Sequence, residues 1–295
     1  MICIYHSRDL DGWMSAAIVK LRHPEVELIG WDYGQPIPSP LDETSLIILV
    51  DVCLPKPTMD MLGKNGTGNL IWIDHHISAI KEMKVDGVPE PAGLRNIHFA
   101  ACELTWKYFF PNENMPEIVR LLGRYDCFGH KGTPEELTVL QFQYGARAAI
   151  ANPDDAYKYL KQIVNTIDPP ETTIVGWLLD TGRAIYKYLC TEAQQTYAKK
   201  FTVMFDTYKF AMVNQERFNP INFGIDYHKD GYDGFLCFWY QNGKWSFSLY
   251  NDNGLVDCSE ICKQNGGGGH KGAAGFTKTS LDEFFANAIN DLSWK

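Results

Sequence analysis

One hexapeptide, residues 71–76, constrains the fold of this chain more than any other stretch. It reads Ile-Trp-Ile-Asp-His-His, so three apolar residues lead directly into three residues that can carry metal or proton chemistry. A buried strand of a parallel sheet has this pattern, because its apolar side chains fill the core and its C-terminal end opens onto the ligand-binding edge. The sequence therefore predicts a strand over residues 69–73 that brings Asp74, His75 and His76 to a sheet edge.

Two further apolar runs end in the same way. Residues 1–5 are followed by residues 6–12, which read His-Ser-Arg-Asp-Leu-Asp-Gly, and residues 46–50 are followed by Asp51. Because parallel strands bring their C-terminal ends to one edge of the sheet, we expect these polar side chains to form one site.

Strand-like and helix-like segments alternate through the first part of the chain. This alternation is typical of an α/β domain with a doubly wound, mainly parallel sheet. The expected elements are strands over 1–5, 26–31, 46–50 and 69–73, helices over about 12–20 and 57–62, and a proline-rich loop over 35–40.

The remainder of the chain changes character twice. From Ala100 the pattern is helical, and from Phe201 it favours strands with a hairpin turn at residues 241–243, Gln-Asn-Gly. We expect a helical linker region over 132–200 between an N-terminal α/β domain (1–131) and a smaller α+β C-terminal domain (201–295). The expected elements are helices over about 103–109, 116–122 and 171–200, further helices after Pro134, strands over 201–205, 210–213, 234–240 and 244–250, and a final helix from about Leu281.

Composition sets the class of protein. Hydrophobic residues make up 45% of the chain and charged residues 21%, as in globular proteins. No apolar run approaches the ~20 residues of a membrane span, and the first residues lack the pattern of an export signal. None of the eight cysteines lies in a C-x-x-C pair. We therefore expect reduced thiols, a cytoplasmic protein and no membrane partner.

The net charge of −9 limits the partners. Proteins that grip long duplexes neutralise phosphates with an excess of Lys and Arg, and neither residues 1–200 nor residues 201–295 have such an excess. We therefore expect a small phosphate substrate and no long-duplex nucleic acid. The oligomeric state stays open between monomer and homodimer.

The acidic and imidazole residues predict a metal site. Carboxylates this close repel one another unless cations lie between them. Mixed carboxylate and imidazole ligands suit Mn²⁺, Fe²⁺ or Co²⁺, with Mg²⁺ as a further alternative. The number of carboxylates allows two ions, which in such pairs lie ~3.5–4 Å apart and activate a hydroxide for in-line attack on phosphorus. The set comprises Asp9, Asp11, Asp51, Asp74 and Asp126, with His6, His75 and His76.

Two alternatives qualify this interpretation. A single carboxylate, such as Asp9 or Asp11, could instead cap the helix predicted to begin near Gly12. The second motif, Gly266–Gly269 followed by His270 and Lys271, could gather backbone N–H groups around a phosphate, or it could be a flexible loop.

These motifs resemble those of the DHH phosphoesterase family. Residues 74–76 resemble its naming motif, residues 6–12 its first motif, Asp51 its second and Arg124-Tyr125-Asp126 its fourth. Residues 266–276 resemble the glycine-rich motif of the DHH-associated C-terminal domain. The resemblance covers residues 1–131 and about 201–280 in matching order. One departure is that two residues separate the first His from its Asp, whereas many members have three.

The resemblance implies a role for each residue. One ion would be held by His6, Asp9 and Asp51, and the other by Asp11, Asp51, His75 and Asp126, with Asp51 bridging. Asp74 would orient a ligand, and His76 would face the scissile phosphate. A substrate phosphate would be held by Gly267, Gly268, Gly269 and His270, from the second domain, across a cleft.

The resulting hypothesis is a metal-dependent phosphodiesterase that cleaves short oligonucleotides or dinucleotides with a hydroxide activated by two metal ions, most simply Mn²⁺. The alternatives are a phosphomonoesterase, a pyrophosphatase or polyphosphatase of the same family, a single-strand exonuclease, and a catalytically silent nucleotide-binding module. Intact ligand motifs count against the last of these.

Overall fold

The computed structural model forms two units, Met1–Ile185 and Tyr186–Lys295. The structure describes residues 1–39, 41, 44–63, 68–84, 87, 89–165 and 170–282. Helices that follow residue 131 contribute to the core of the first unit rather than standing apart from it. We describe each unit by itself.

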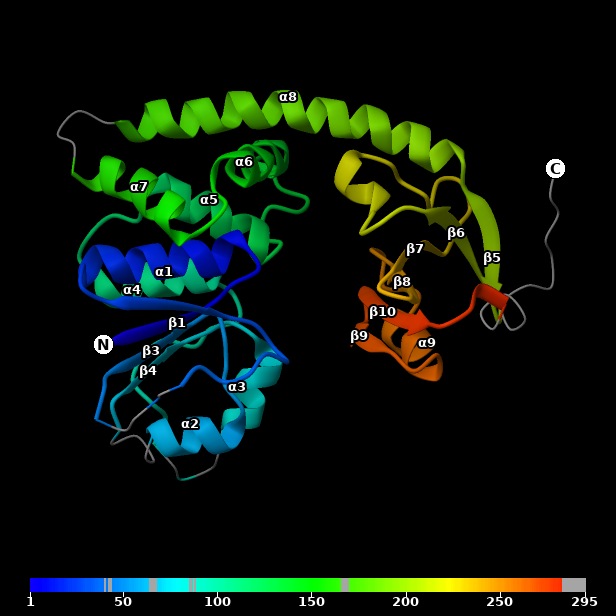
Figure 1. Ribbon diagram of the computed structural model, residues 1–295. Helices are drawn as coiled ribbons and strands as arrows, with labels where there is room; N and C mark the ends of the chain where they lie inside the picture. Colours follow the sequence, from blue (N-terminus) through cyan, green and yellow to red (C-terminus); the bar gives the residue numbers. More distant parts are fainter. Residues whose placement is uncertain are drawn as a thin grey trace. The chain divides into compact units, whose positions relative to one another are not determined.

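The first unit is built on a four-stranded sheet in which every pairing is parallel (Figure 1). The register places Tyr5 opposite Val50, and Val50 opposite Ile73, so these strands end side by side. The predicted parallel α/β sheet is therefore confirmed. In the order β2-β1-β3-β4 the strands are β2 (Glu27–Trp31), β1 (Ile2–His6), β3 (Ile47–Val50) and β4 (Leu70–Ile73).

Helices cover both faces of this sheet, because its strands are apolar on both sides. In β3, Ile47 and Leu49 pack into one cluster with Met59, whereas Ile48 packs into another with Leu104. Figure 1 shows helices on each face. They are α1 (Leu10–Arg22) and α4 (Ala101–Phe109) on one side, and α2 (Lys56–Gly63) and α3 (Ile77–Met83) on the other. The sequence pattern did not predict α3.

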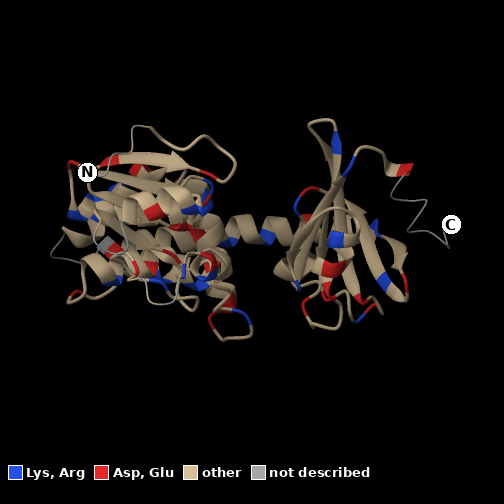
Figure 2. Ribbon diagram, turned by 90° about the horizontal axis from the view of Figure 1, so that it is seen from below, with Lys and Arg blue, Asp and Glu red and all other residues tan. Residues whose placement is uncertain are grey.

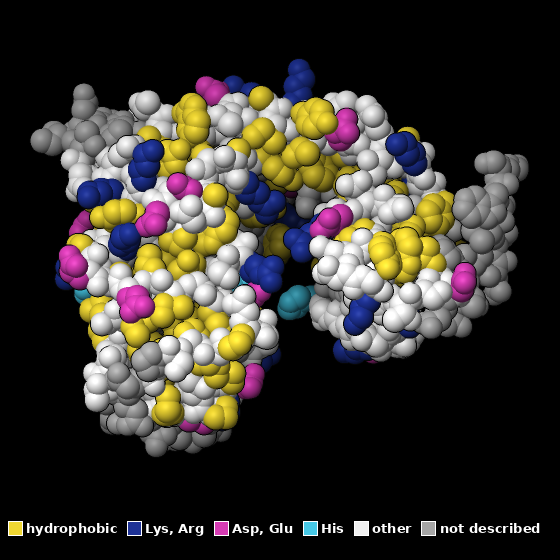
Figure 3. Space-filling model, in the orientation of Figure 1, with side chains coloured by type: hydrophobic (Ala, Val, Ile, Leu, Met, Phe, Trp, Pro, Cys, Tyr) yellow, Lys and Arg dark blue, Asp and Glu magenta, His cyan; other side chains and the backbone are white. Residues whose placement is uncertain are grey.

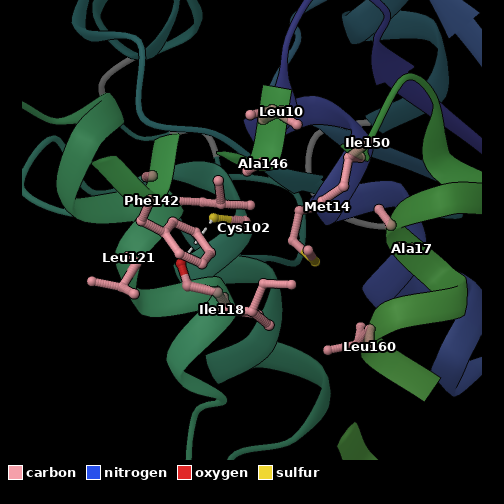
Figure 4. Close-up of a cluster of buried hydrophobic side chains, with 14 of the residues drawn as sticks. Leu10, Met14, Ala17, Cys102, Ile118, Leu121, Phe142, Ala146, Ile150 and Leu160 are labelled. Carbon is pink, nitrogen blue, oxygen red and sulfur yellow. Dashed lines mark hydrogen bonds between the residues drawn. The ribbon is translucent and has the colours of Figure 1, made fainter. Parts of the chain in front are cut away.

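A helical layer packs against the outer side of α1. Figure 4 shows Met14 of α1 pointing into a cluster with Ile118, Phe142 and Leu160, one from each of three further helices. These helices are α5 (Glu117–Asp126), α6 (Glu136–Ala149) and α7 (Pro153–Val164). α5 runs to Asp126, four residues beyond its predicted end, so the predicted ligand Asp126 lies in its last turn.

The long predicted helix is present as α8 (Pro170–Ala198) and belongs partly to each unit. Its first half packs on α6 at two glycines. A Cβ on Gly182 would lie 1.7 Å from the carbonyl oxygen of Gln141, and a Cβ on Gly145 would lie 1.9 Å from that of Leu178. The two backbones therefore touch, which only glycine allows.

The second unit contains a six-stranded mixed sheet in the order β5-β6-β7-β8-β10-β9. Its turn between β7 and β8 has positive φ at Asn242 (52°) and Gly243 (77°), which confirms the predicted hairpin. The elements are β5 (Phe201–Phe205), β6 (Tyr208–Asn214), η2 (Pro220–Phe223), β7 (Gly234–Gln241), β8 (Lys244–Tyr250), α9 (Cys258–Gln264), β9 (Gly268–His270) and β10 (Ala273–Lys278).

Two apolar clusters enclose this sheet. One contains Cys258 and Ile261 of α9, and the other contains Ala193 and Tyr197 from the end of α8. Most of the helix predicted from about Leu281 lies outside the described residues.

Along the ribbon of each unit in Figure 2, Lys and Arg are interspersed with Asp and Glu. Within the described part of the chain, no helix combines the length and the apolar character that crossing a membrane requires.

The close contact between α6 and α8 yields a stability prediction. Gly182→Ala adds a methyl group where no space exists, and we expect it to lower the free energy of unfolding by about 1–3 kcal/mol. The matched control is Gly176→Ala in the same helix, where a Cβ meets nothing within 4 Å. That variant should raise stability by up to about 1 kcal/mol, because alanine favours helices. Urea unfolding followed by circular dichroism measures both, and equal shifts would contradict the assigned contact.

Candidate metal centre

Asp51 lies at the centre of a cluster formed by the ends of three strands. The residue follows β3 directly, His6 ends β1, and His75 comes two residues after β4. One carboxylate oxygen of Asp51 lies 3.4 Å from Nδ1 of His6, and the other lies 3.3 Å from Nε2 of His75. With 1% of its surface exposed, Asp51 is a buried carboxylate between two imidazoles.

The backbone at Asp51 is strained. Its φ of 61° lies in the left-handed region, which costs a residue with a side chain about 1 kcal/mol or more. Its N–H donates to the carbonyl of Ile73 at 3.0 Å, so the neighbouring strand holds this conformation. Left-handed non-glycine residues cluster at functional sites. Here the turn points the carboxylate into the cluster.

Asp9 combines the two roles that the sequence left open. One of its oxygens accepts a hydrogen bond from the backbone N–H of Gly12 at 3.0 Å and so caps α1. The other lies 2.9 Å from Nδ1 of His6. A Cβ on Gly12 would lie 2.0 Å from the carbonyl oxygen of His6, so glycine is required for α1 to begin this close to the end of β1.

Asp11 is held mainly by the backbone of another helix. Its two oxygens accept hydrogen bonds from the N–H groups of Ala101 and Cys102, at 2.9 and 2.7 Å, at the start of α4. Its nearest imidazole is that of His75, at 3.7 Å. Burial, reinforced by the negative charge of Asp51, raises the pKa of Asp11 to about 7.

His75 connects Asp51 with the end of α5. Its Nε2 lies 3.3 Å from Asp126, and its Nδ1 lies 3.7 Å from the Sγ of Cys127. Cys127 was not among the predicted site residues, although its position directly after Asp126 could have indicated it. Burial raises the pKa of the Cys127 thiol.

Asp32 is a second residue that the sequence reasoning missed. It follows β2 directly, so the rule that identified the other strand ends would also have found it. Its Oδ1 lies 3.5 Å from Nε2 of His6, and its Oδ2 accepts a hydrogen bond from Arg8 at 2.5 Å. Desolvation would raise the pKa of Asp32, but the hydrogen bonds from Arg8 and from the backbone N–H of Tyr33 together outweigh it and lower that pKa.

Asp74 contacts its own segment of the chain and positions His76. Its Oδ1 accepts hydrogen bonds from the backbone N–H groups of His75 and His76, and its Oδ2 accepts one from the indole of Trp72. The same Oδ1 lies 2.7 Å from Nδ1 of His76. That nitrogen is 3.8 Å from Asp51, so Asp74 holds the His76 ring at the border of the cluster.

The donors fit divalent cations. Three sets each offer ligand atoms within 4.8 Å of one another, namely His6-Asp9-Asp51, Asp51-His75-His76 and His75-Asp126-Cys127. Nδ1 of His6 and Oδ1 of Asp51 are buried without a hydrogen bond of ordinary geometry, although charged partners lie within 3.4 Å. Buried nitrogen and oxygen atoms that lack a hydrogen bond are the ones to which a bound cation can supply the missing partner. Asp11 stands outside these sets.

The glycine-rich motif lies in the second unit and is largely a strand. The structure places Gly268–His270 in β9, paired with β10. Gly266 has φ 83°, and a Cβ on Gly267 would lie 2.1 Å from the carbonyl oxygen of Gly275. Gly269 has φ 139° and touches Ala274. The turn after α9 and the hairpin therefore require three of the four glycines, and His270 is exposed at the end of β9.

The central role of Asp51 can be tested with one substitution. Asp51→Asn removes one negative charge, while asparagine tolerates the left-handed backbone. We expect the affinity for Mn²⁺ to fall by more than about tenfold, which is the smallest loss typical of removing even an indirect partner of a metal ligand. Calorimetric titration and metal content measure this. Asp60→Asn, at an exposed carboxylate of α2, should bind as the wild type does, and full affinity in Asp51→Asn would exclude the central role.

A second prediction concerns protons. Burial alone would lower the pKa of His6, but the carboxylates of Asp51 and Asp9 outweigh it and raise that pKa to about 10. Burial alone would also lower the pKa of His75, but its acidic neighbours, with Asp51 as the main partner, outweigh burial and raise that pKa to about 12. In chelated protein both imidazoles are therefore protonated near neutral pH, and a cation must displace these protons.

We expect Mn²⁺ binding to release about two protons per protein and to strengthen as pH rises. Calorimetry in buffers of different ionisation enthalpy measures the release. Binding without any proton release would show that these imidazoles do not ligate.

Comparison with known proteins gives one distant relative in sequence. No family model matches the chain. The chain is 20% identical to the uncharacterized protein R106 of Acanthamoeba polyphaga mimivirus over 290 residues. This alignment covers 94% of the chain. The chain spans 58% of that protein's length.

Solved structures are more informative about the fold. The pGpG-specific phosphodiesterase PggH from Vibrio cholerae matches with a TM-score of 0.55 and 13% identity, over 97% of this chain and 95% of that one. RecJ in complex with Mg²⁺ from Thermus thermophilus matches with a TM-score of 0.43 and 14% identity, over 97% of this chain and 48% of that one. Taken with the motifs in their order along the chain, the likeness to the phosphodiesterase gives the conclusion that this chain has the fold of the DHH phosphoesterases.

Proposed function

We propose that this chain hydrolyses a phosphodiester bond in a small nucleotide with the help of two divalent cations. The observation that carries the proposal is the position of Asp51, whose two oxygens face two different imidazoles within one buried cluster. A carboxylate in this position can contribute one oxygen to each of two cations. The fold shared with a phosphodiesterase supports the same reaction class.

The ligand sets follow from the family resemblance and the observed distances. We assign His6, Asp9 and Asp51 to one cation, and His75, Asp126 and Asp51 to the other. We add Asp11 to the second set. Its carboxylate lies 3.7 Å from Nε2 of His75 and also accepts hydrogen bonds from the backbone of α4. Two bound cations would lower the pKa of a water molecule and offset the charge of the phosphoryl group. Oxygen and imidazole donors suit Mn²⁺ best, with Mg²⁺, Fe²⁺ and Co²⁺ as alternatives.

His76 is assigned to the substrate. The hydrogen bond that Nδ1 of His76 makes to the carboxylate of Asp74 raises the pKa of His76, which favours the charged ring, and this ring can donate a hydrogen bond to a phosphoryl oxygen. Asp74 is buried and bonded through both oxygens, so it fixes the ring without reaching the substrate itself. A carboxylate that orients an imidazole in this way is also found where a histidine acts as a general acid.

The substrate class we favour is a dinucleotide or a short oligonucleotide. The structural neighbour PggH is specific for pGpG, a linear dinucleotide, and this chain carries a net charge of −9, which disfavours long strands. We assign the exposed His270, with the backbone of Gly267, Gly268 and Gly269, to a substrate phosphate. The eight cysteines, all free thiols, support a reducing compartment such as the cytoplasm.

A product assay tests this function. Mn²⁺-loaded protein should convert pGpG and short RNA or DNA oligonucleotides to mononucleotides, and chelation should stop the reaction. His270→Ala should lower kcat/KM for the dinucleotide by more than about tenfold but affect bis(p-nitrophenyl) phosphate far less, because only the natural substrate uses remote binding energy to position its phosphorus.

Lys263→Ala, at an exposed residue of α9, is the control and should behave as the wild type does. Activity confined to pyrophosphate, polyphosphate or phosphomonoesters such as 3′,5′-bisphosphorylated adenosine would reject the proposal in favour of the alternative phosphatases. Binding of a dinucleotide without turnover, at full metal content, would instead indicate a silent binding module.

A further inference from the structure

A cavity of about 440 Å³ lies beside the metal centre, entirely within the first unit. It is formed by the loop after β2, the segment after β3, and α3. On the face shown in Figure 3, hydrophobic side chains gather over the part of this unit where Figure 1 places α2 and α3. A volume of this size is at the lower end of the range for small-molecule sites and suits a nucleoside.

His76 belongs both to this cavity and to the border of the metal cluster. Its ring lines the cavity, while its Nδ1 lies 3.8 Å from Asp51. A molecule whose phosphate lies at the metal centre would therefore place the group attached to that phosphate next to the cavity. In a nucleotide this group is the sugar and its base.

The wall formed by the loop after β2 is aromatic and held in place. Trp31 donates its indole N–H to the carbonyl of Pro36 at 3.1 Å, and the Tyr33 hydroxyl accepts a hydrogen bond from the backbone N–H of Cys53 at 3.2 Å. The two rings meet edge to face at 5.4 Å. Tyr33 is nevertheless 52% exposed, so it is a fixed aromatic ring that remains accessible. Fixed rings of this kind bind bases by stacking, at little cost in conformational entropy.

The other walls combine apolar side chains with one carboxylate. Leu54, Ala79 and Met83 provide the apolar surface, and Glu82 on α3 lines the cavity while staying exposed. An ionised carboxylate can only accept hydrogen bonds. Among the common bases, guanine alone presents two adjacent donors, N1–H and the N2 amine, which match the two oxygens of a carboxylate. Inorganic polyphosphate offers neither a ring to stack nor a donor.

We propose that this cavity binds the nucleobase of the substrate and that Glu82 makes it selective for guanine. The inference rests on the proposed function, since it places the attached phosphate at the metal centre. It adds a substrate class to that function, namely nucleotides with a guanine next to the scissile phosphate. Tyr33 supplies the stacking surface, and Glu82 supplies the discrimination.

Nucleosides test the cavity separately from catalysis, because they contain no phosphorus. Binding of guanosine and adenosine is measured by ligand-observed NMR titration. The wild type should bind guanosine about tenfold more tightly, the difference expected for one well-placed bidentate contact to a base. Glu82→Gln should remove this preference, because the amide replaces one acceptor with a donor. Glu25→Gln, the same change at an exposed position before β2, should keep it.

Tyr33 provides the second arm of the experiment. Tyr33→Leu should weaken the binding of both nucleosides, and Tyr33→Phe, which keeps the ring but loses its hydrogen bond to Cys53, should weaken it less. In hydrolysis, Glu82→Gln should bring the ratio of kcat/KM for pGpG over pApA close to one. Equal binding of the two nucleosides by the wild type would overturn the guanine assignment, and unchanged binding in Tyr33→Leu would overturn the cavity as the base site. Guanosine binding as expected, in a protein that cleaves only pyrophosphate, would support the cavity and reject the proposed phosphodiesterase.

Discussion

The buried carboxylate of Asp51 is the group on which the rest of the site depends. A charge in this position is stable only if positive partners lie on both sides, and the imidazoles of His6 and His75 occupy those sides. The parallel sheet makes this arrangement possible, because β1, β3 and β4 end in register. The left-handed turn at Asp51 then directs the carboxylate inward instead of along the strand. The proposed metal chemistry therefore depends on the geometry of the sheet.

Much of this arrangement could be predicted from the sequence, because it rests on a local pattern. An apolar run that ends in a ligand residue is visible in three places, and the parallel sheet brings the three ends together. Asp32 obeys the same rule, because it follows the apolar run of β2 directly and lies beside His6. Cys127 and the bonding of Asp11 to α4 are different, because they depend on how helices far apart in sequence pack, which no local pattern records.

The role of the glycine run, residues 266–269, could not be predicted from the sequence. A run of four suggests a loop that gathers N–H groups, yet most of these residues serve the turn after α9 or the β9–β10 hairpin, where they adopt positive φ or allow close backbone contact. Composition alone does not separate the two, since both need the absence of a Cβ. The helices after residue 131 are a similar case. Their apolar faces could have covered either unit, and only the packing of Phe142 and Leu160 against Met14 assigns them to the first.

The donors of the cluster are spread along the chain from His6 to Asp126, and this has a consequence for folding. No short segment contains a complete set, so the site forms only after β1, β3, β4 and α5 have come together. Such long-range closure belongs to the late stages of folding. Cations that bind only the finished arrangement leave the folding rate almost unchanged and slow unfolding instead. For the proposed metal-bound protein, the lifetime of the folded chain therefore increases with the supply of metal ions in its surroundings.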